Sequence, residues 1–191
     1  VHFRTGGIGL AHIDELHAAI KRFRESGKPA VFFAADMPEG LGAYYFASVF
    51  DEIWLQPVGT LVLGGINVEA PYFKELMDKL GITAEFVRRK EYKTLYESVT
   101  SQEMSPQNRE MLTAMIESLS GSILSGIADL RGMREADVKD SIDMALLTDQ
   151  EALDAGLIDH VAYGDVVLDK LHEKLGMDPE SGELPLVKMH S

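Results

Sequence analysis

The sequence predicts an α/β domain with a largely parallel sheet flanked by helices. Short apolar runs alternate with amphipathic segments over the first ninety residues, and that order implies right-handed crossovers between parallel strands. The run at 30–35 is continuously apolar, which is typical of a parallel strand buried on both faces. An apolar content of 46% and a charged content of 26% over 191 residues are those of a soluble globular protein.

The first half of the chain contains most of the expected strands. Strands are expected at 30–35, 53–55, 60–63 and 83–87, and helices at 11–26, 40–48 and 70–80. The helix at 11–26 has an apolar face with spacings of three and four: Ile13, Leu16, Ile20 and Phe23. The helix at 70–80 is expected to turn these side chains inward: Tyr72, Phe73, Leu76, Met77 and Leu80. His12 and His17 are five residues apart, so we expect surface positions and no metal binding.

The second half is predicted to be mostly helical. Ser105 and Pro106 are a helix N-cap and first residue, and the apolar spacing continues to about Arg131. Small residues in the middle of this helix would permit close packing against another helix. Shorter helices are expected at 134–141, 148–156 and 165–175, and the composition of 177–191 is that of a linker followed by the start of another domain.

Charge and composition exclude several classes of function. The net charge is −13, and residues 101–191 carry 18 acidic and only 7 basic side chains, which argues against a nucleic-acid partner. Without cysteine there is no disulfide, thiolate metal site or cysteine nucleophile. We expect neither a metal ion nor a cofactor. No continuous apolar run approaches the ~18–20 residues that span a bilayer, and no signal peptide is visible.

Several segments occur in an order and spacing that identify a family. They are SGKP at 26–29, YYFAS at 44–48, DEIWLQPVG at 51–59, YKT at 92–94 and EALDAGLID at 151–159. Over residues 6–175 the chain resembles the signal peptide peptidase A (protease IV) family. The resemblance implies a crotonase-like α/β fold related to Clp-type proteases, and catalysis by a serine–lysine dyad.

The resemblance assigns the lysine of the dyad but no serine. The family lysine lies in a Y-K-[ST] motif, here Tyr92-Lys93-Thr94, so the role of general base carries over to Lys93. The family serine opens an S-G-G-Y turn, here Leu41-Gly42-Ala43-Tyr44, and leucine has no nucleophilic atom. This implies the lysine-bearing first half of the long, tandem-duplicated form. Residues 1–176 would then be a peptidase domain without its opening strands, and the serine would come from a second domain or protomer.

A lysine acts as a base only when it is neutral. With an ordinary pKa near ~10.4, fewer than about one side chain in a thousand is neutral at pH 7, so burial must lower the pKa. Groups near Lys93 in sequence that would favour the neutral form are the apolar walls Tyr92, Leu95 and Tyr96 and the like charges Arg88, Arg89 and Lys90. Docking of a second domain would complete this desolvation, so we expect the isolated chain to lack peptidase activity.

Other candidate groups carry weaker signals. Ser98 and Ser101 are close to Lys93 in sequence, but nothing marks them as nucleophiles, and Ser48 is expected to pack near a buried helix. The turn containing Gly6 and Gly7 could cradle an anion, yet its spacing matches no phosphate-binding motif. After Lys93, Glu97 matches the family's continuation Y-K-S-A-x-E-P-F, whereas the two residues that follow it do not.

Three functions remain open from the sequence. The first is half of a serine peptidase that degrades cleaved signal peptides and other hydrophobic peptides. The second is a catalytically silent crotonase-like module used for oligomer assembly. The third, an acyl-CoA hydratase or isomerase, has the fold but lacks a recognisable acid/base pair. The resemblance further implies a homo-oligomer at the periplasmic face of an inner membrane.

Overall fold

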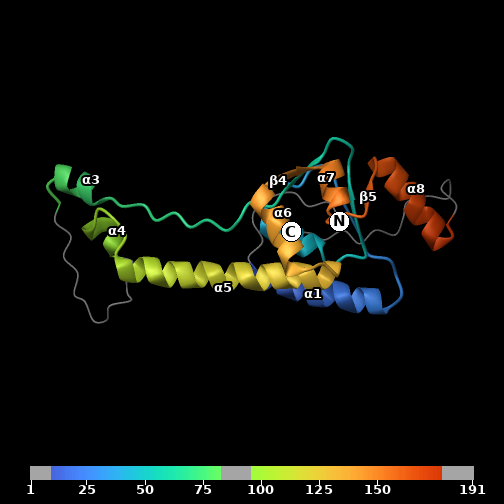
Figure 1. The fold of residues 1–191 in the computed structure, drawn as a ribbon, viewed down its shortest axis with the longest axis horizontal. Coiled ribbons are helices and arrows are strands. Elements are labelled where there is room, and N and C mark those ends of the chain that lie inside the picture. Colours follow the sequence, from blue (N-terminus) through green and yellow to red (C-terminus); the bar gives the residue numbers. More distant parts are fainter. Residues whose placement is uncertain (1–9, 83–95, 178–191) are drawn as a thin grey trace. The chain divides into compact units, whose positions relative to one another are not determined.

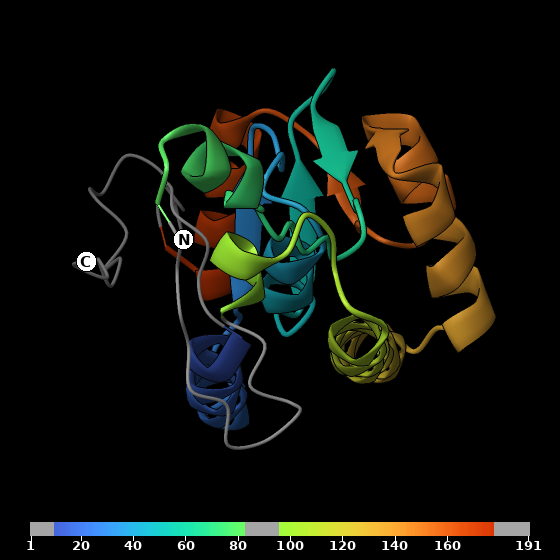
Figure 2. The same ribbon diagram turned by 90° about the vertical axis from the view of Figure 1, so that its left-hand side faces the viewer.

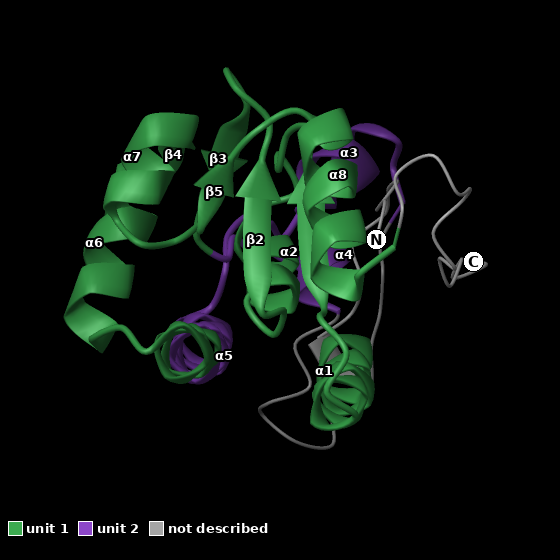
Figure 3. Cartoon of the chain, turned by 90° about the vertical axis from the view of Figure 1, so that its right-hand side faces the viewer, with its two compact units in different colours: residues 1–65, 123–191 green, residues 66–122 purple. Residues whose placement is uncertain are grey.

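The computed structural model describes residues 10–82 and 96–177, which form two compact units. Unit 1 comprises residues 1–65 and 123–191, and unit 2 comprises residues 66–122 (Figure 3). Unit 1 contains α1 (Leu10–Glu25), β1 (Val31–Ala34), α2 (Leu41–Ala47), β2 (Glu52–Leu55), β3 (Thr60–Val62), α6 (Glu135–Met144), β4 (Leu146–Thr148), α7 (Asp149–Asp154), β5 (His160–Val161) and α8 (Gly164–Leu175). Unit 2 contains α3 (Lys74–Lys79) and α4 (Glu97–Thr100), and α5 (Pro106–Arg131) starts in unit 2 and ends in unit 1 (Figures 1 and 3).

The main sheet of unit 1 is parallel, which confirms the predicted α/β class. Its strand order is β1-β2-β5, with Phe32 opposite Ile53 and Trp54 opposite His160. Helix α8 covers one face of this sheet and α2 lies on the other (Figures 2 and 3). A second sheet pairs β3 with β4 in antiparallel register. Strand β4 was not predicted, because a three-residue strand is defined by its distant partner and leaves little local pattern.

An aromatic cluster fills the core between α2 and the sheet. Phe32 from β1, Phe46 from α2 and Phe50 lie with ring centroids 5.4–6.3 Å apart, in tilted and edge-to-face arrangements. Such pairs stabilise a core beyond the area that they bury. Ile53 and Leu55 of β2 are fully buried beside them. The apolar run of β1 is less buried than predicted, since only Phe32 of its four residues is fully inside.

Most predicted helix ends are confirmed. The hydroxyl of Ser105 accepts a hydrogen bond from the Asn108 amide at 3.2 Å, as an N-cap should at the start of α5. Thr148 and Glu151 form a reciprocal capping box at the start of α7. Helix α8 ends at Gly176 in the left-handed conformation. Helix α6 is longer than predicted and extends to Met144.

One predicted apolar face is wrong as a statement about burial, and a second is wrong at a single residue. The helix expected at 70–80 spans only Lys74–Lys79 and buries none of its side chains; Phe73, Leu76 and Leu80 are 46%, 53% and 63% exposed. Phe23 on α1 is also exposed. Periodicity shows that one side of a helix is apolar, but it does not show that another element of the same chain covers that side.

Helix α5 also changes one expectation about membranes. It is the one helix in the described part of the chain that is long and apolar enough, by length and composition only, to cross a membrane. The absence of a continuous apolar run concealed this, because serine and glycine residues lie between its apolar side chains. The small residues serve packing at Gly126, where an added Cβ would lie 2.6 Å from the Tyr45 ring. Core helices of soluble proteins meet the same criterion of length and composition.

Candidate active site

The predicted base lies outside the described residues. Lys93, with Tyr92 and Thr94, falls between residues 82 and 96, so its role stays a prediction. The described chain resumes at Tyr96 and enters α4 at Glu97. The structure does describe the turn at Leu41 in unit 1, where the family serine would lie. In unit 2 it also describes a network around Glu97, which follows the lysine motif in the sequence.

The turn that would carry a serine carries a buried leucine. Gly40 has φ 86° and ψ −166° and is the N-cap of α2, a conformation that favours glycine. Leu41 is the first residue of the helix and is only 4% exposed. The sharp turn therefore aims an aliphatic side chain into the core of unit 1.

The chain leading into this turn is fixed by hydrogen bonds to β3. The carboxylate of Asp36 accepts from the Thr60 amide at 2.7 Å and from the Thr60 hydroxyl at 2.6 Å. These two donors lower the pKa of Asp36 below its ordinary value. Met37 forms a parallel bridge with Leu61. The residues that lead into the turn are thus bound to β3.

Ser48 is buried, as predicted, and its hydroxyl has a structural role. It is 1% exposed and donates to the Tyr45 carbonyl at 2.7 Å at the end of α2. Ser98 is half-buried, and its carbonyl accepts from the Phe73 amide at 2.5 Å. Ser101 donates its amide to the Glu97 carbonyl at 2.9 Å. None of these contacts is a pairing of a serine hydroxyl with a base.

A buried carboxylate is the main feature of unit 2 that sequence reasoning missed. Glu97 is 5% exposed, and its oxygens accept from the Ser105 hydroxyl at 2.6 Å, the Ser105 amide at 3.2 Å and the Asn108 side-chain amide at 3.1 Å. Asn108 is also buried, at 7% exposed. The available signal was the family motif match at Glu97 together with the Ser-Pro helix start eight residues later.

The prediction that His17 lies at the surface is wrong. His17 is 5% exposed; its Nε2 lies 2.9 Å from the Tyr45 carbonyl, which fixes Nε2 as the protonated nitrogen of the neutral ring. Its ring meets the Tyr45 ring edge-on with centroids 4.5 Å apart. Burial lowers the pKa of His17 below the ordinary 6.5, and the hydrogen bond to Tyr45 opposes this only in part. His12 is exposed, as expected.

Stability is expected to fall in acid because of His17. A histidine whose folded pKa is depressed stabilises the fold above the unfolded pKa, near 6.5, and this contribution is lost as the pH falls from there through the folded pKa. Urea unfolding at pH 7.5 and at closely spaced values below 6.5 measures the loss. His17→Gln can still donate to the Tyr45 carbonyl but does not titrate, so its stability should depend less on pH in this window. If the unfolding free energy of both proteins depended equally on pH, the loss of stability in acid would not come from His17.

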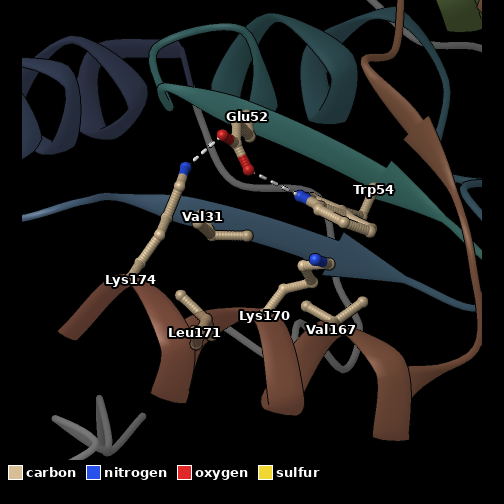
Figure 4. Close-up of a pocket in the computed structure, with 7 residues that line it drawn as sticks. All are labelled: Val31, Glu52, Trp54, Val167, Lys170, Leu171 and Lys174. Atoms are coloured by element: carbon tan, nitrogen blue, oxygen red, sulfur yellow. Dashed lines mark hydrogen bonds and ion pairs between the residues drawn. The ribbon is translucent and has the colours of Figure 1, made fainter. Parts of the chain in front are cut away.

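A shallow pocket in unit 1 brings polar groups together between the sheet and α8 (Figure 4). The Trp54 indole donates to Glu52 at 3.0 Å, and the Lys174 ammonium pairs with the other oxygen of the same carboxylate. Burial acts to raise the pKa of Glu52, but the bonds from Lys174 and Trp54 outweigh it and lower the pKa. Lys170 pairs with Glu173. Because these groups bind one another, we interpret the pocket as a structural contact of α8.

The residues that the structure describes, 10–82 and 96–177, include no group of three or more histidine and acidic side chains that could hold a metal ion. The other ion pair of note joins the end of α5 to Asp159, the residue that precedes β5. Arg131 donates to Asp159 through Nη1 at 3.0 Å and Nη2 at 2.8 Å, and Asp159 also accepts from the Ile53 amide at 2.7 Å. This network links the end of α5 to the sheet of unit 1, and we interpret its role as structural.

Comparison with known proteins shows similarity to one peptidase family. The model of peptidase family S49 matches residues 22–178. The chloroplastic serine protease SPPA of Arabidopsis thaliana is 27% identical over 187 residues, 98% of this chain and 27% of that protein. Protease 4 of Haemophilus influenzae is 29% identical over 129 residues, 68% of this chain and 21% of that protein. The chain thus spans about a quarter of the length of these curated relatives.

A solved structure of a peptidase from Plasmodium falciparum is similar over 84% of this chain and 72% of its own. Its sequence identity is 12% and its TM-score is 0.44.

Proposed function

Because this chain belongs to peptidase family S49, we propose that it is the lysine-bearing half of a serine peptidase site. Lys93 is the general base, and the nucleophilic serine comes from a second domain of the same family or from a neighbouring protomer. The observation that carries this proposal is Leu41, which occupies the serine position of the family turn and is buried in unit 1. A complete dyad therefore needs a serine from elsewhere.

The division of the site suits the chemistry of a lysine base. A serine hydroxyl attacks a peptide carbonyl only as a base removes its proton, and an ammonium group cannot do this. A lysine exposed to water stays protonated at neutral pH. Docking of the serine-bearing domain would both bring the hydroxyl and remove water from Lys93. The isolated chain is accordingly inactive.

The substrates that we propose are cleaved signal peptides and other hydrophobic peptides. The setting that we propose is the periplasmic face of an inner membrane, with the protein assembled as a homo-oligomer. Exposed apolar side chains of unit 2 support assembly: Val68, Phe73, Leu76, Leu80, Ile82, Met111 and Met115. The same observation favours the second candidate function, a silent module that serves only assembly. The two candidates differ in whether Lys93 contacts a nucleophile.

Active-site labelling of the full-length protein tests the origin of the serine. A fluorophosphonate probe reacts with a serine activated by a base, and peptide mapping locates the label. We expect one labelled serine outside residues 1–191, with labelling proportional to the loss of peptidase activity. The chain 1–191 alone should neither label nor hydrolyse a hydrophobic peptide.

Three outcomes would contradict the proposal. A label on Ser48, Ser98 or Ser101 would place the nucleophile within this chain. Normal turnover by the chain 1–191 would show that no second domain is needed. If the full-length protein hydrolyses peptides but labels equally after Lys93→Ala, the activated serine does not depend on Lys93, and the silent-module function is favoured.

A further inference from the structure

The buried carboxylate of Glu97 caps α5 from outside that helix. In an ordinary capping box, the residue at the third helical position accepts a hydrogen bond from the N-cap amide. Here that position is Asn108, which donates, and the acceptor for the Ser105 amide is Glu97 at 3.2 Å. The Ser105 hydroxyl completes the network, since it donates to Glu97 at 2.6 Å and accepts from the Asn108 amide at 3.2 Å. Glu97 therefore fixes α4 to the first turn of α5.

The hydrogen-bond network around Glu97 is buried, and burial of a charged group requires such bonds. A carboxylate that is 5% exposed must be compensated by hydrogen bonds, and Glu97 accepts from three donors at the N-terminus of a helix, where negative charge is favoured. A second contact fixes the adjacent residue, because the Ser98 carbonyl accepts from the Phe73 amide at 2.5 Å. Helix α4 is thus attached to both α5 and the start of α3.

Glu97 lies close in sequence to Lys93, the proposed base. Glu97 lies four positions after Lys93, and four extended steps of the chain span at most about 14 Å. We propose that Glu97 is a positioning residue for the peptidase reaction: its buried carboxylate holds the end of the chain segment that carries Lys93. This inference rests on the proposed role of Lys93 as the base. Glu97 itself does not touch the substrate in this scheme.

The test measures the full-length protein with Glu97→Gln beside wild type. A glutamine cannot accept from all three donors, because its amide nitrogen meets donors at one of the two oxygen positions. We expect kcat to fall about 10- to 100-fold, the loss typical of a misplaced catalytic group, with KM changed less than about twofold. The ascending limb of the pH profile of kcat/KM should move to higher pH, because a freed lysine regains its hydration. Loss of folded protein alone would lower kcat without moving this limb.

Glu103→Gln is the matched control, since Glu103 is an exposed carboxylate on the connection between α4 and α5. It should behave as wild type. Ser105→Ala removes one donor and leaves Glu97 in place, and Ser105→Thr keeps the hydroxyl. For Ser105→Ala we expect a smaller loss of kcat than for Glu97→Gln, with the ascending limb of the kcat/KM profile moved in the same direction. For Ser105→Thr we expect kcat and the pH profile to stay near those of wild type. These two variants decide the question if Glu97→Gln fails to fold.

The results separate this inference from the proposed function. If Lys93→Ala keeps full activity, the proposed function fails and this inference fails with it. If Lys93→Ala is inactive but Glu97→Gln matches the Glu103→Gln control, the inference alone is overturned. It is also overturned if kcat falls without movement of the ascending limb, because Glu97 would then only stabilise the fold.

Discussion

Replacing Lys93 by alanine in the full-length protein is expected to lower kcat for a hydrophobic peptide by about 10³-fold or more, with assembly unchanged. Alanine removes the only nitrogen of this side chain that can accept a proton from the serine. Substrate binding does not require that proton transfer, so KM should change little. The effect therefore appears as a loss of kcat.

The measurement compares initial rates of wild type and Lys93→Ala after size-exclusion chromatography has shown the same assembly. Lys139→Ala is the control, because it removes an exposed positive charge that pairs with Asp143 and leaves the Tyr92-Lys93-Thr94 motif and its neighbours intact. It should retain most of the activity. Full activity in Lys93→Ala would mean that the site lies wholly outside this chain and that the chain has a scaffolding role.

Replacing Arg131 by methionine is expected to cost the chain about 3 kcal/mol of unfolding free energy. The Arg131 side chain is 9% exposed, and it donates to both oxygens of Asp159 and to the Gly156 carbonyl. Methionine keeps the apolar stem but leaves the partly buried Asp159 carboxylate without its cation. Asp159 also accepts from the Ile53 amide, so the disturbance reaches the central strand of the sheet.

Urea unfolding followed by the fluorescence of Trp54, the single tryptophan of the chain, measures this loss. Arg134→Met is the matched control, since Arg134 lies three residues further along and pairs with Asp137 on the surface, with 81% of its side chain exposed. The midpoint of that variant should stay close to wild type, because exposed ion pairs contribute little. Equal midpoints for the two variants would show that the Arg131–Asp159 pair does not stabilise unit 1.

Local signals allowed much of the fold to be predicted. Ser105 and Pro106 fixed the start of α5, Gly156 the end of α7, and the alternating segments the parallel sheet, because each depends on neighbours in sequence. The antiparallel pairing of β3 with β4 and the burial of His17 under Tyr45 were missed. Both depend on residues far away in the chain, which periodicity cannot reveal.

The candidate site was predictable only in part, for similar reasons. The absence of a nucleophile at Leu41 follows from residue identity, and the structure adds that this leucine is buried. The role of Glu97 requires the position of Ser105 and Asn108, which fold back onto it. An acidic residue after a lysine motif is ordinarily a solvated charge, and the match of Glu97 to the family motif did not by itself show that its side chain is buried. The role of Lys93 stays a prediction.

The burial of Leu41 also bears on evolution. Serine at this position would replace an apolar side chain in the core by a small polar one, and large-to-small changes in a core typically cost about 2–5 kcal/mol. Replacement of Leu41 by serine alone would therefore weaken unit 1. Mutations around the Gly40 turn that open space for a hydroxyl would have to come first. The packing of unit 1 therefore favours an apolar residue at position 41.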